Sequence, residues 1–155
     1  MPENRSASNW RVRSCCPSAF GSTFDHEAAF TDAEWTDRAS RGADGPDRAT
    51  FLAHAGEEIV GVVGGYREEP GSAVVELVSM WVAPHARRQG TAAALVRTVI
   101  HWAAATAATR MGLWVTRGNA PAIVLYTDLG FGETSDVQPL PSDPCKEELR
   151  MTLNL

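Results

Sequence analysis

The chain has 155 residues, which is long enough for a single domain with a sizeable hydrophobic core. Its 14 lysine and arginine residues are outnumbered by 19 aspartate and glutamate residues, and the net charge of −5 argues against a nucleic-acid partner. No apolar run approaches the roughly 20 residues of a membrane-spanning helix, and the N-terminus lacks a signal-peptide pattern, so we expect a cytoplasmic protein with no membrane partner.

The cysteine and histidine residues lack the spacing of a metal site. Two of the 3 cysteines are adjacent, Cys15 and Cys16, and the third is Cys145, while the 4 histidines are scattered along the chain. We therefore expect free thiols and no bound metal.

The N-terminal part of the chain carries the weakest structural signals. Residues 1–16 read as a short polar leader in which only 10–14 has the character of a strand. The leader is followed by one domain over 17–155. Within that domain, two short helices are predicted first, over 25–30 and 32–40.

The middle of the chain predicts a β-hairpin followed by a long strand. The hairpin strands are expected at about 50–54 and 58–67. Gly64 and Gly65 in the second strand indicate a bulge or a place where another backbone comes close. The β-branched and aromatic run at 72–84 is the strongest strand signal and is long enough to be central in a sheet.

The C-terminal part alternates helices and strands. In order, it predicts a helix at 91–106, a strand at 111–116, a helix that starts near Pro121 and stops at Gly130, an acidic and proline-rich loop at 133–148, and a strand at 148–155. The first of these helices lacks a glycine near its end, around Ala107. Together the elements predict an α/β (α+β) fold with a mixed, mostly antiparallel central sheet flanked by helices.

The junction before the long helix is a candidate anion site. Residues 84–96, "PHARRQGTAAALV", pass from a proline and a basic turn into an alanine-rich helix without a conventional capping side chain. Unpaired N–H groups and the helix dipole would meet there, and Gly90 would let a phosphate approach the main chain. Arg87 and Arg88 add charge for a pyrophosphate. The alternative is an ordinary strand-to-helix turn with solvated arginines, and neither GxxxxGK[ST] nor GxGxxG is present.

Two motifs carry a family resemblance. "RRQGTA", residues 87–92, fits the pattern Q/R-x-x-G-x-G/A, and "LWVTRGNAPAIVLYTDLGF" adds a strand, an asparagine and a helix that bears Leu-Tyr and ends in Gly-Phe. Together they resemble the GNAT superfamily of acetyl-CoA-dependent N-acetyltransferases over roughly residues 17–155. The resemblance implies the GNAT-like acyl-CoA N-acyltransferase fold, with acetyl-CoA as acetyl donor.

The resemblance also implies a role for each matching position. The pyrophosphate would be held by the main-chain amides of Arg88, Gln89, Gly90, Thr91, Ala92 and Ala93, with Arg87 beside them. The pantetheine and the acetyl carbonyl would face the strand at Met80, Trp81 and Val82. Asn119 would bind the pantetheine, and Tyr126 would lie near the thioester sulfur.

The reaction needs a polarised carbonyl, a neutral amine and a proton for the departing thiolate. A backbone N–H near Val82 is the candidate for the oxyanion. Tyr126, with an ordinary pKa of about 10, is the candidate general acid, and a half-buried core tyrosine is the alternative. Glu76, a carboxylate in an apolar strand, is either the base for the incoming ammonium or an exposed or salt-bridged residue.

These assignments predict direct acetyl transfer, in a ternary complex, to the primary amine of a small molecule such as an amine metabolite or an antibiotic. The alternatives are a protein N-terminal or lysine acetyltransferase and a non-catalytic acyl-CoA-binding or sensing module. Glu27, Trp35 and the loop at 136–144 fall where the family builds its acceptor pocket. An exposed sheet edge favours a homodimer.

Overall fold

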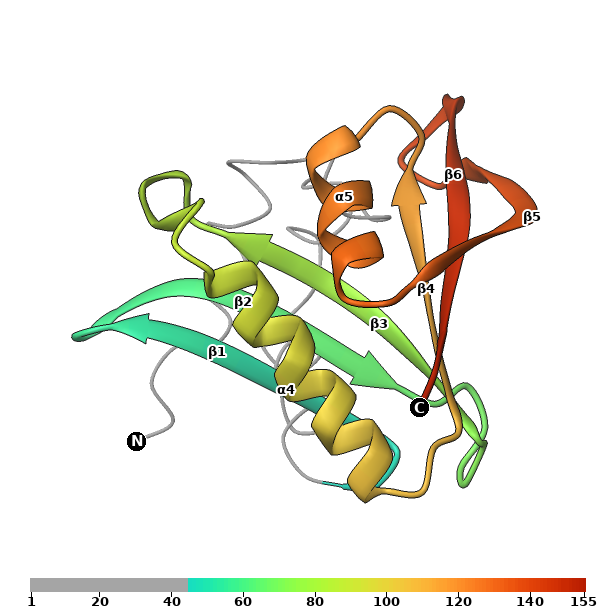
Figure 1. Ribbon diagram of the computed structural model, residues 1–155, viewed down its shortest axis with the longest axis horizontal. Helices are drawn as coiled ribbons and strands as arrows, with labels where there is room; N and C mark the ends of the chain where they lie inside the picture. The colour runs from blue at the N-terminus through green and yellow to red at the C-terminus, as the bar shows by residue number, and fades with distance from the viewer. Residues whose placement is uncertain (1–44) are drawn as a thin grey trace, which may run out of the picture.

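The computed structural model describes residues 45–155, which form one sheet of six strands and two α-helices (Figure 1). The predictions made for residues 1–44, including the leader, both short helices, the paired cysteines, Glu27 and Trp35, lie outside the described residues. The elements are β1 (Arg48–Ala55), β2 (Glu58–Tyr66), β3 (Val74–Val82), the 3-10 turn η2 (Pro84–Ala86), α4 (Thr91–Ala105), β4 (Arg110–Thr116), α5 (Ala120–Asp128), β5 (Gly132–Leu140) and β6 (Asp143–Asn154).

The sheet has the strand order β1-β2-β3-β4-β6-β5, and every neighbouring pair is antiparallel except β3 and β4. The mixed, mostly antiparallel sheet confirms the predicted fold class. The parallel pair is short, since it joins only residues 74–76 to residues 110–112. Beyond these residues the two strands diverge toward their C-terminal ends, as Figure 1 shows.

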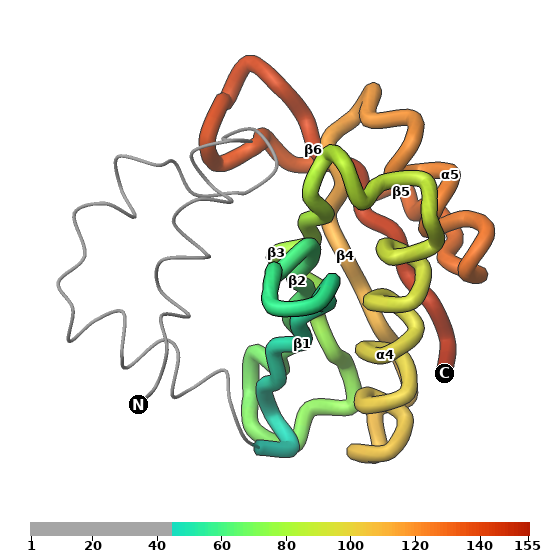
Figure 2. The backbone as a smooth tube through the Cα atoms, turned by 90° about the vertical axis from the view of Figure 1, so that its left-hand side faces the viewer, coloured from blue at the N-terminus to red at the C-terminus, as the bar shows by residue number. Residues whose placement is uncertain are grey.

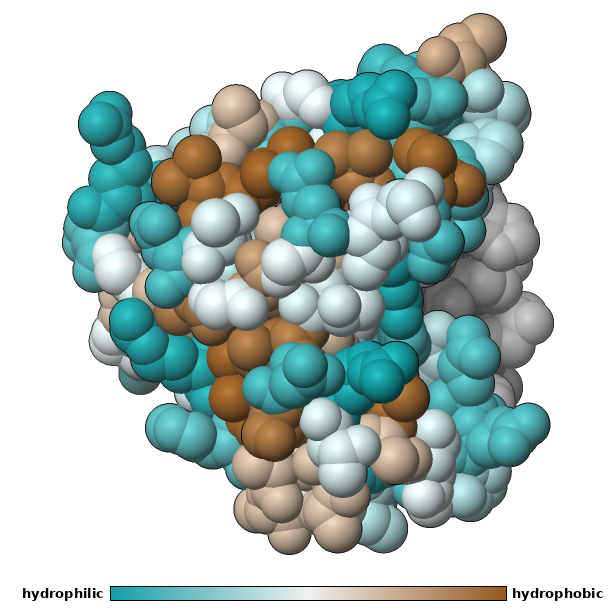
Figure 3. All heavy atoms as spheres, turned by 45° about the vertical axis from the view of Figure 1, so that its right-hand side comes forward, coloured by the Kyte–Doolittle hydropathy of each residue, from teal (hydrophilic) through white to brown (hydrophobic). Residues whose placement is uncertain are grey.

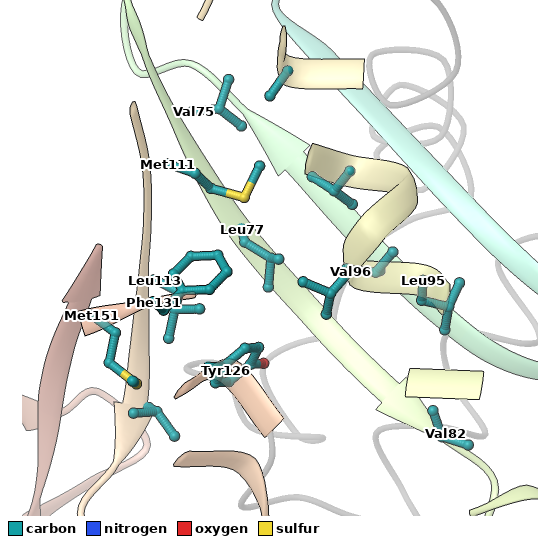
Figure 4. Packing of buried hydrophobic residues seen from close by; sticks show 14 of the residues in the cluster. Val75, Leu77, Val82, Leu95, Val96, Met111, Leu113, Tyr126, Phe131 and Met151 are labelled. Atoms are coloured by element: carbon teal, nitrogen blue, oxygen red, sulfur yellow. The ribbon is translucent and has the colours of Figure 1, made fainter. Parts of the chain in front are cut away.

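Both helices lie on the same side of the sheet, which Figure 2 shows edge-on. Helix α4 packs against β1, β2 and β3, and its buried residues recur at the helical spacing that the sequence predicted. They are Leu95, Val96, Val99 and Ala103. Helix α5 places Tyr126 edge-on against Phe131, with 5.7 Å between the ring centroids. Figure 4 shows how these residues meet side chains of β3, β4 and β6 in one core.

Glycines in β2 let α4 approach the sheet closely. A Cβ atom at Gly65 would lie 2.9 Å from the side chains of Val99 and Trp102. A Cβ atom at Gly61 would lie 2.8 Å from Leu95. The sequence predicted a bulge or another backbone close to the paired glycines. The structure has a register shift between Val62 and Gly64, and the groups closest to Gly65 are helix side chains rather than a backbone.

The exposed large hydrophobic residues of the described part of the chain are Val78, Val124, Val137 and Leu155. On the face that Figure 3 shows, hydrophobic residues form several groups with hydrophilic residues around them. No helix among residues 45–155 is long and apolar enough to cross a membrane.

The prediction of a loop at 133–148 is wrong. This segment forms β5 and the first half of β6, which pair as an antiparallel hairpin from Leu140↔Asp143 onward. Pro139 is tolerated because β5 is the outermost strand of the sheet, where a missing N–H breaks no central ladder. Pro141 lies in the turn between the strands, and Pro144 lies in β6 before the residues that pair with β4. The acidic residues are tolerated because most of β5 is exposed.

Helix α4 ends in a Schellman motif without a glycine. Ala107 takes the left-handed conformation, with φ of 63°. Its N–H donates to the carbonyl of Ala104 at 3.1 Å, and the N–H of Ala108 donates to the carbonyl of Ala103 at 2.9 Å. The helix therefore stops where the sequence offered no stop signal, with an alanine in a conformation that favours glycine.

Replacing Ala107 with glycine is expected to raise the free energy of unfolding by about 0.5–1 kcal/mol. The change removes the cost of a left-handed alanine in the folded state, of roughly 1–2 kcal/mol. Part of this gain is offset because glycine raises the conformational entropy of the unfolded chain. Ala104→Gly, at an exposed position inside the same helix, is the control and should lower stability by about 0.5–1 kcal/mol. Urea denaturation of the two variants checks the opposite signs, and a loss of stability in Ala107→Gly would contradict the motif.

A buried arginine ties three segments together at one end of the sheet. Arg67 is only 5% exposed. Its guanidinium donates to the carbonyl of Pro46 and, at 2.8 Å, to the carbonyl of Thr106 at the end of α4. Its Nε donates to the carbonyl of Ser72 at 2.6 Å. Arg67 thus joins the start of β1, the β2–β3 connection and the C-terminal end of α4, where a cation also complements the helix dipole.

Candidate active site

A pocket of about 610 Å³ occupies the space between the diverging halves of β3 and β4. It is lined by consecutive residues of both strands, 77–82 and 114–116, so it reaches both faces of the sheet. Tyr126 lines it on the helix side, and Glu148 of β6 lines it on the opposite side. Two ligands could therefore meet in this pocket, one from each face of the sheet.

Strand β3 carries a bulge where it borders this pocket. Gly64 pairs with Val78 and Val62 pairs with Trp81, so β3 has one residue more than β2 over this interval. Ser79 in the bulge has φ of 56°, a left-handed conformation that costs a non-glycine residue free energy. The bulge interrupts the pairing of β3 with β2 at Ser79 and Met80, and the pairing resumes at Trp81 and Val82, which also line the pocket.

The turn before α4 and the first turn of α4, residues 88–93, have unpaired main-chain N–H groups, called here the ring of amides. Arg88 and Gly90 both have positive φ, 59° and 83°. Within the described part of the chain, the N–H groups of residues 88–93 donate no hydrogen bond, and the first helical bond runs from Ala94 to Gly90. The first turn of α4 contains no acidic residue that would compensate the positive end of its dipole.

Side chains of the same segment hold its shape. The Nε of Arg87 donates to the carbonyl of Val82 at 2.9 Å. The Nε2 of Gln89 donates to the carbonyl of His85 at 3.0 Å. The hydroxyl of Thr91 donates to the carbonyl of Ala86 at 3.3 Å. Of the residues predicted to contact the cofactor, Gln89 and Thr91 do not line the pocket. The structure gives their side chains a supporting position behind the ring of amides.

Helix α5 brings the second motif to the pocket. Asn119 is the N-cap, and its Oδ1 accepts from the N–H of Ala122 at 3.4 Å, which leaves its amide NH₂ group for a ligand. Tyr126 is 6% exposed, and its hydroxyl has no hydrogen-bond partner among the described residues. Figure 4 shows its oxygen directed away from Leu113 and Phe131. Burial raises the pKa of Tyr126 to about 12.

Glu76 does not line the pocket. Its two carboxylate oxygens accept from both terminal nitrogens of Arg150, at 2.5 and 2.6 Å. Both side chains are largely buried, with 13% and 16% exposed, and Gly112 makes room for the guanidinium. This bidentate pair favours the salt-bridge interpretation of Glu76 over the general-base interpretation.

Two polar groups of the pocket were missed by sequence reasoning. Glu148 is 9% exposed, lines the pocket, and accepts from the Nε2 of Gln138 at 2.9 Å. The indole N–H of Trp81 is buried without a hydrogen-bond partner among the described residues. Glu148 is the first residue of the predicted strand at 148–155, so a shared face with Arg150 followed from the sequence. The sequence did not show that Arg150 pairs with Glu76 instead, because these residues are 74 positions apart.

A comparison with known families shows the family of this chain. A family model described as the acetyltransferase (GNAT) family matches residues 10–131. This chain belongs to the GNAT family. The matched segment contains the ring of amides at Gly90, the diverging strands β3 and β4, and helix α5 with Tyr126.

Individual GNAT relatives agree with the fold. N-acetyltransferase 8B from Rattus norvegicus is 35% identical over 92 residues, which are 57% of this chain and 41% of that protein. The solved structure of ribosomal-protein-alanine N-acetyltransferase from Brucella melitensis superimposes with a TM-score of 0.73 at 18% identity, covering 96% of this chain and 93% of that one. Nourseothricin acetyltransferase superimposes with a TM-score of 0.64 at 26% identity, covering 72% and 68%.

Proposed function

We propose that this GNAT protein transfers the acetyl group of acetyl-CoA to the primary amine of a small molecule, by direct attack in a ternary complex. The observation that carries the proposal is a single pocket that joins an anion-binding ring of amides to the opposite face of the sheet. One ligand can enter along the helices and a second from the far face. The reacting groups would meet between β3 and β4.

The residues around Gly90 fit the pyrophosphate of coenzyme A. A Cβ atom added at Gly90 would meet nothing within 4 Å, so open space lies directly over this backbone. The unpaired N–H groups of residues 88–93 supply donors for phosphate oxygens, and the N-terminus of α4 supplies a favourable dipole. Arg88, exposed at the rim of the pocket, adds a positive charge.

The bulged part of β3 would bind the acyl end. Acetyl-CoA supplies an acetyl group already activated as a thioester. Because β3 pairs with β4 only at residues 74–76, the other edge of Met80, Trp81 and Val82 would have main-chain groups for the pantetheine amides and for the acetyl carbonyl. The NH₂ group of Asn119 would donate to the pantetheine from the other side of the pocket. These contacts would orient the carbonyl and stabilise the charge that develops on its oxygen.

Tyr126 would protonate the departing sulfur. Its pKa of about 12 keeps the hydroxyl protonated over the whole physiological range, so the donor is always present. The same value makes it a weaker acid than an exposed tyrosine, which favours transfer of the proton only as negative charge builds up on the sulfur. The pocket lining contains no cysteine or histidine among the described residues, which favours direct attack over an acetyl-enzyme intermediate.

The class of acceptor is the finer part of the proposal. A pocket of about 610 Å³ lies within the range of small-molecule sites. Nourseothricin acetyltransferase is named for a small-molecule antibiotic, whereas the Brucella melitensis protein is named for a ribosomal-protein alanine. A protein N-terminus or lysine is therefore the second candidate acceptor. A non-catalytic acyl-CoA-binding module would bind the same cofactor without turnover.

Replacing Gly90 with alanine is expected to weaken acetyl-CoA binding about tenfold or more. The methyl group would occupy the space over the amides, and φ of 83° is unfavourable for alanine. Gly56→Ala is the matched control, because Gly56 also has positive φ, 62°, and open space around its Cβ, but lies in the β1–β2 turn. Titration calorimetry should show weaker binding only for Gly90→Ala. Equal affinity in both variants would contradict the proposed phosphate site.

A further inference from the structure

The far end of the pocket, on the sheet face away from α4 and α5, contains an unusual carboxylate. Glu148 lies on this face because its neighbours Leu149 and Met151 alternate with it and Met151 is buried in the helix-side core. It pairs across the sheet with Thr116 on one side and Gln138 on the other. Thr116 also lines the pocket, so this row of residues forms one wall of it.

Glu148 has no cationic partner among the described residues. The three cations nearest to it in β6 and at the end of β4 are each paired with another acid. The pairs are Arg150 with Glu76, Arg117 with Glu147, and Lys146 with Asp143. Glu148 keeps one neutral donor, the amide of Gln138 on its Oε2, while Oε1 accepts from no described residue.

The pairing of Arg150 is the reason that Glu148 stays unpaired. Arg150 and Glu148 are two residues apart in β6 and share a face, so this guanidinium is the natural counter-ion. Both of its terminal nitrogens are instead bound to Glu76, and its centre lies 5.3 Å over the ring of Trp114. A buried charge without a counter-ion is unfavourable unless a ligand supplies one.

A second unpaired group lies on the same face. Trp81 pairs with Val62 and packs against it and Leu52 on this face, it also contacts the helix-side core, and it lines the pocket. Its buried N–H has no partner among the described residues. An unpaired donor and an unpaired carboxylate on two residues that line one pocket indicate a polar ligand rather than an apolar one.

We infer that Glu148 is the residue that binds the acceptor, and that the acceptor is a cationic amine whose ammonium group pairs with its Oε1. This inference rests on the proposed function, which places the acyl donor at the opposite end of the pocket. Glu148 would also accept the proton that this ammonium must lose before its nitrogen can attack the thioester, which is the carboxylate role first considered for Glu76. The ammonium would lie beside Glu148, with its carbon skeleton against the wall formed by Trp114 and Val78.

The experiment compares cationic probes with neutral ones of the same shape. Benzylamine, hexylamine and tyramine, with their hydroxyl counterparts benzyl alcohol, hexanol and tyrosol, are titrated into the full-length protein saturated with coenzyme A. The variants are Glu148→Gln, which keeps a carbonyl oxygen for the Gln138 bond, and Glu147→Gln, which removes an adjacent exposed charge. Urea denaturation of each variant verifies that the fold is intact.

We expect at least one amine to bind the wild type tenfold or more tightly than its hydroxyl counterpart. Glu148→Gln should abolish that difference, and Glu147→Gln should leave it within twofold. In assays with acetyl-CoA, Glu148→Gln should raise KM for the amine tenfold or more and leave the KM for acetyl-CoA unchanged. Amines that bind the wild type no better than the alcohols, or that bind Glu148→Gln as well as the wild type, would overturn the inference.

The outcomes separate this inference from the proposed function. Amine binding that depends on Glu148, without release of thiol from acetyl-CoA, would support the inference and contradict the proposed transferase. Acetyl transfer that is insensitive to Glu148→Gln would support the transferase and overturn the inference.

Discussion

Replacement of Tyr126 by phenylalanine is expected to lower kcat about 10²- to 10⁴-fold while acetyl-CoA binds with unchanged affinity. This range is what a positioned general acid contributes. The ring stays in place because its contact with Phe131, at 5.7 Å, does not involve the hydroxyl. Steady-state kinetics at saturating acetyl-CoA, with calorimetric affinity measured in parallel, separates loss of the proton donor from loss of binding.

The second tyrosine of the chain is the control. Tyr66 is half-buried, lies at the end of β2 under Arg48, and does not line the pocket. Tyr66→Phe should keep kcat within about twofold. A Tyr126→Phe enzyme with kcat within threefold of the wild type would remove Tyr126 from the mechanism and favour the interpretation as a core residue.

Tyr126 also predicts how stability changes in alkali. Its pKa is about 12 in the folded protein because of burial, and about 10 in the unfolded chain. The folded state is therefore favoured below about pH 10, and the contribution is lost as the pH rises from about 10 to about 12. The wild type should lose more stability over this interval than Tyr126→Phe, which urea denaturation at each pH measures.

Replacement of Arg67 by methionine is expected to lower the free energy of unfolding by about 3–5 kcal/mol. The change leaves the carbonyls of Pro46, Ser72 and Thr106 without their donor in a buried site. It also removes the guanidinium from its position 5.7 Å over the ring of Trp102. Thermal unfolding should therefore shift down by about 10 °C.

Arg48→Met is the control for Arg67→Met. Arg48 also lies over an aromatic ring, that of Tyr66 at 5.3 Å, but its side chain is exposed. Its replacement should change stability by no more than about 0.5 kcal/mol. Equal effects of the two substitutions would contradict the assignment of Arg67 as the tie between β1, the β2–β3 connection and α4.

Features set by local sequence were predictable. The β-branched run of β3, the periodic apolar residues of α4 and the glycine before it are short-range signals, and the structure has the corresponding strand, helix and turn. The paired glycines of β2 were interpretable because only a missing Cβ admits the side chains of α4. Most of the candidate cofactor residues fall within one such local stretch, which explains why they gather at one pocket.

Features set by pairing across the sheet were not predictable. The hairpin of β5 and β6 has few local strand signals, and the proline in β5, Pro139, is acceptable because β5 is at the edge of the sheet. Glu76 and Arg150 are 74 residues apart, and Arg67 meets Thr106 across 39 residues. The sequence does not show whether Arg150 pairs with Glu76 or with Glu148, so it also does not show that Glu148 is the carboxylate left without a cation.

Release of free thiol from acetyl-CoA by the wild-type protein in the presence of primary amines tests acetyl transfer directly. Thiol release should rise when a cationic amine is added, and mass spectrometry should find one acetylated amine for each thiol released. Acetyl-CoA alone should raise the unfolding temperature, because a ligand that binds only the folded state stabilises it. Stabilisation without amine-dependent thiol release would indicate a binding module, and the absence of both would contradict the account.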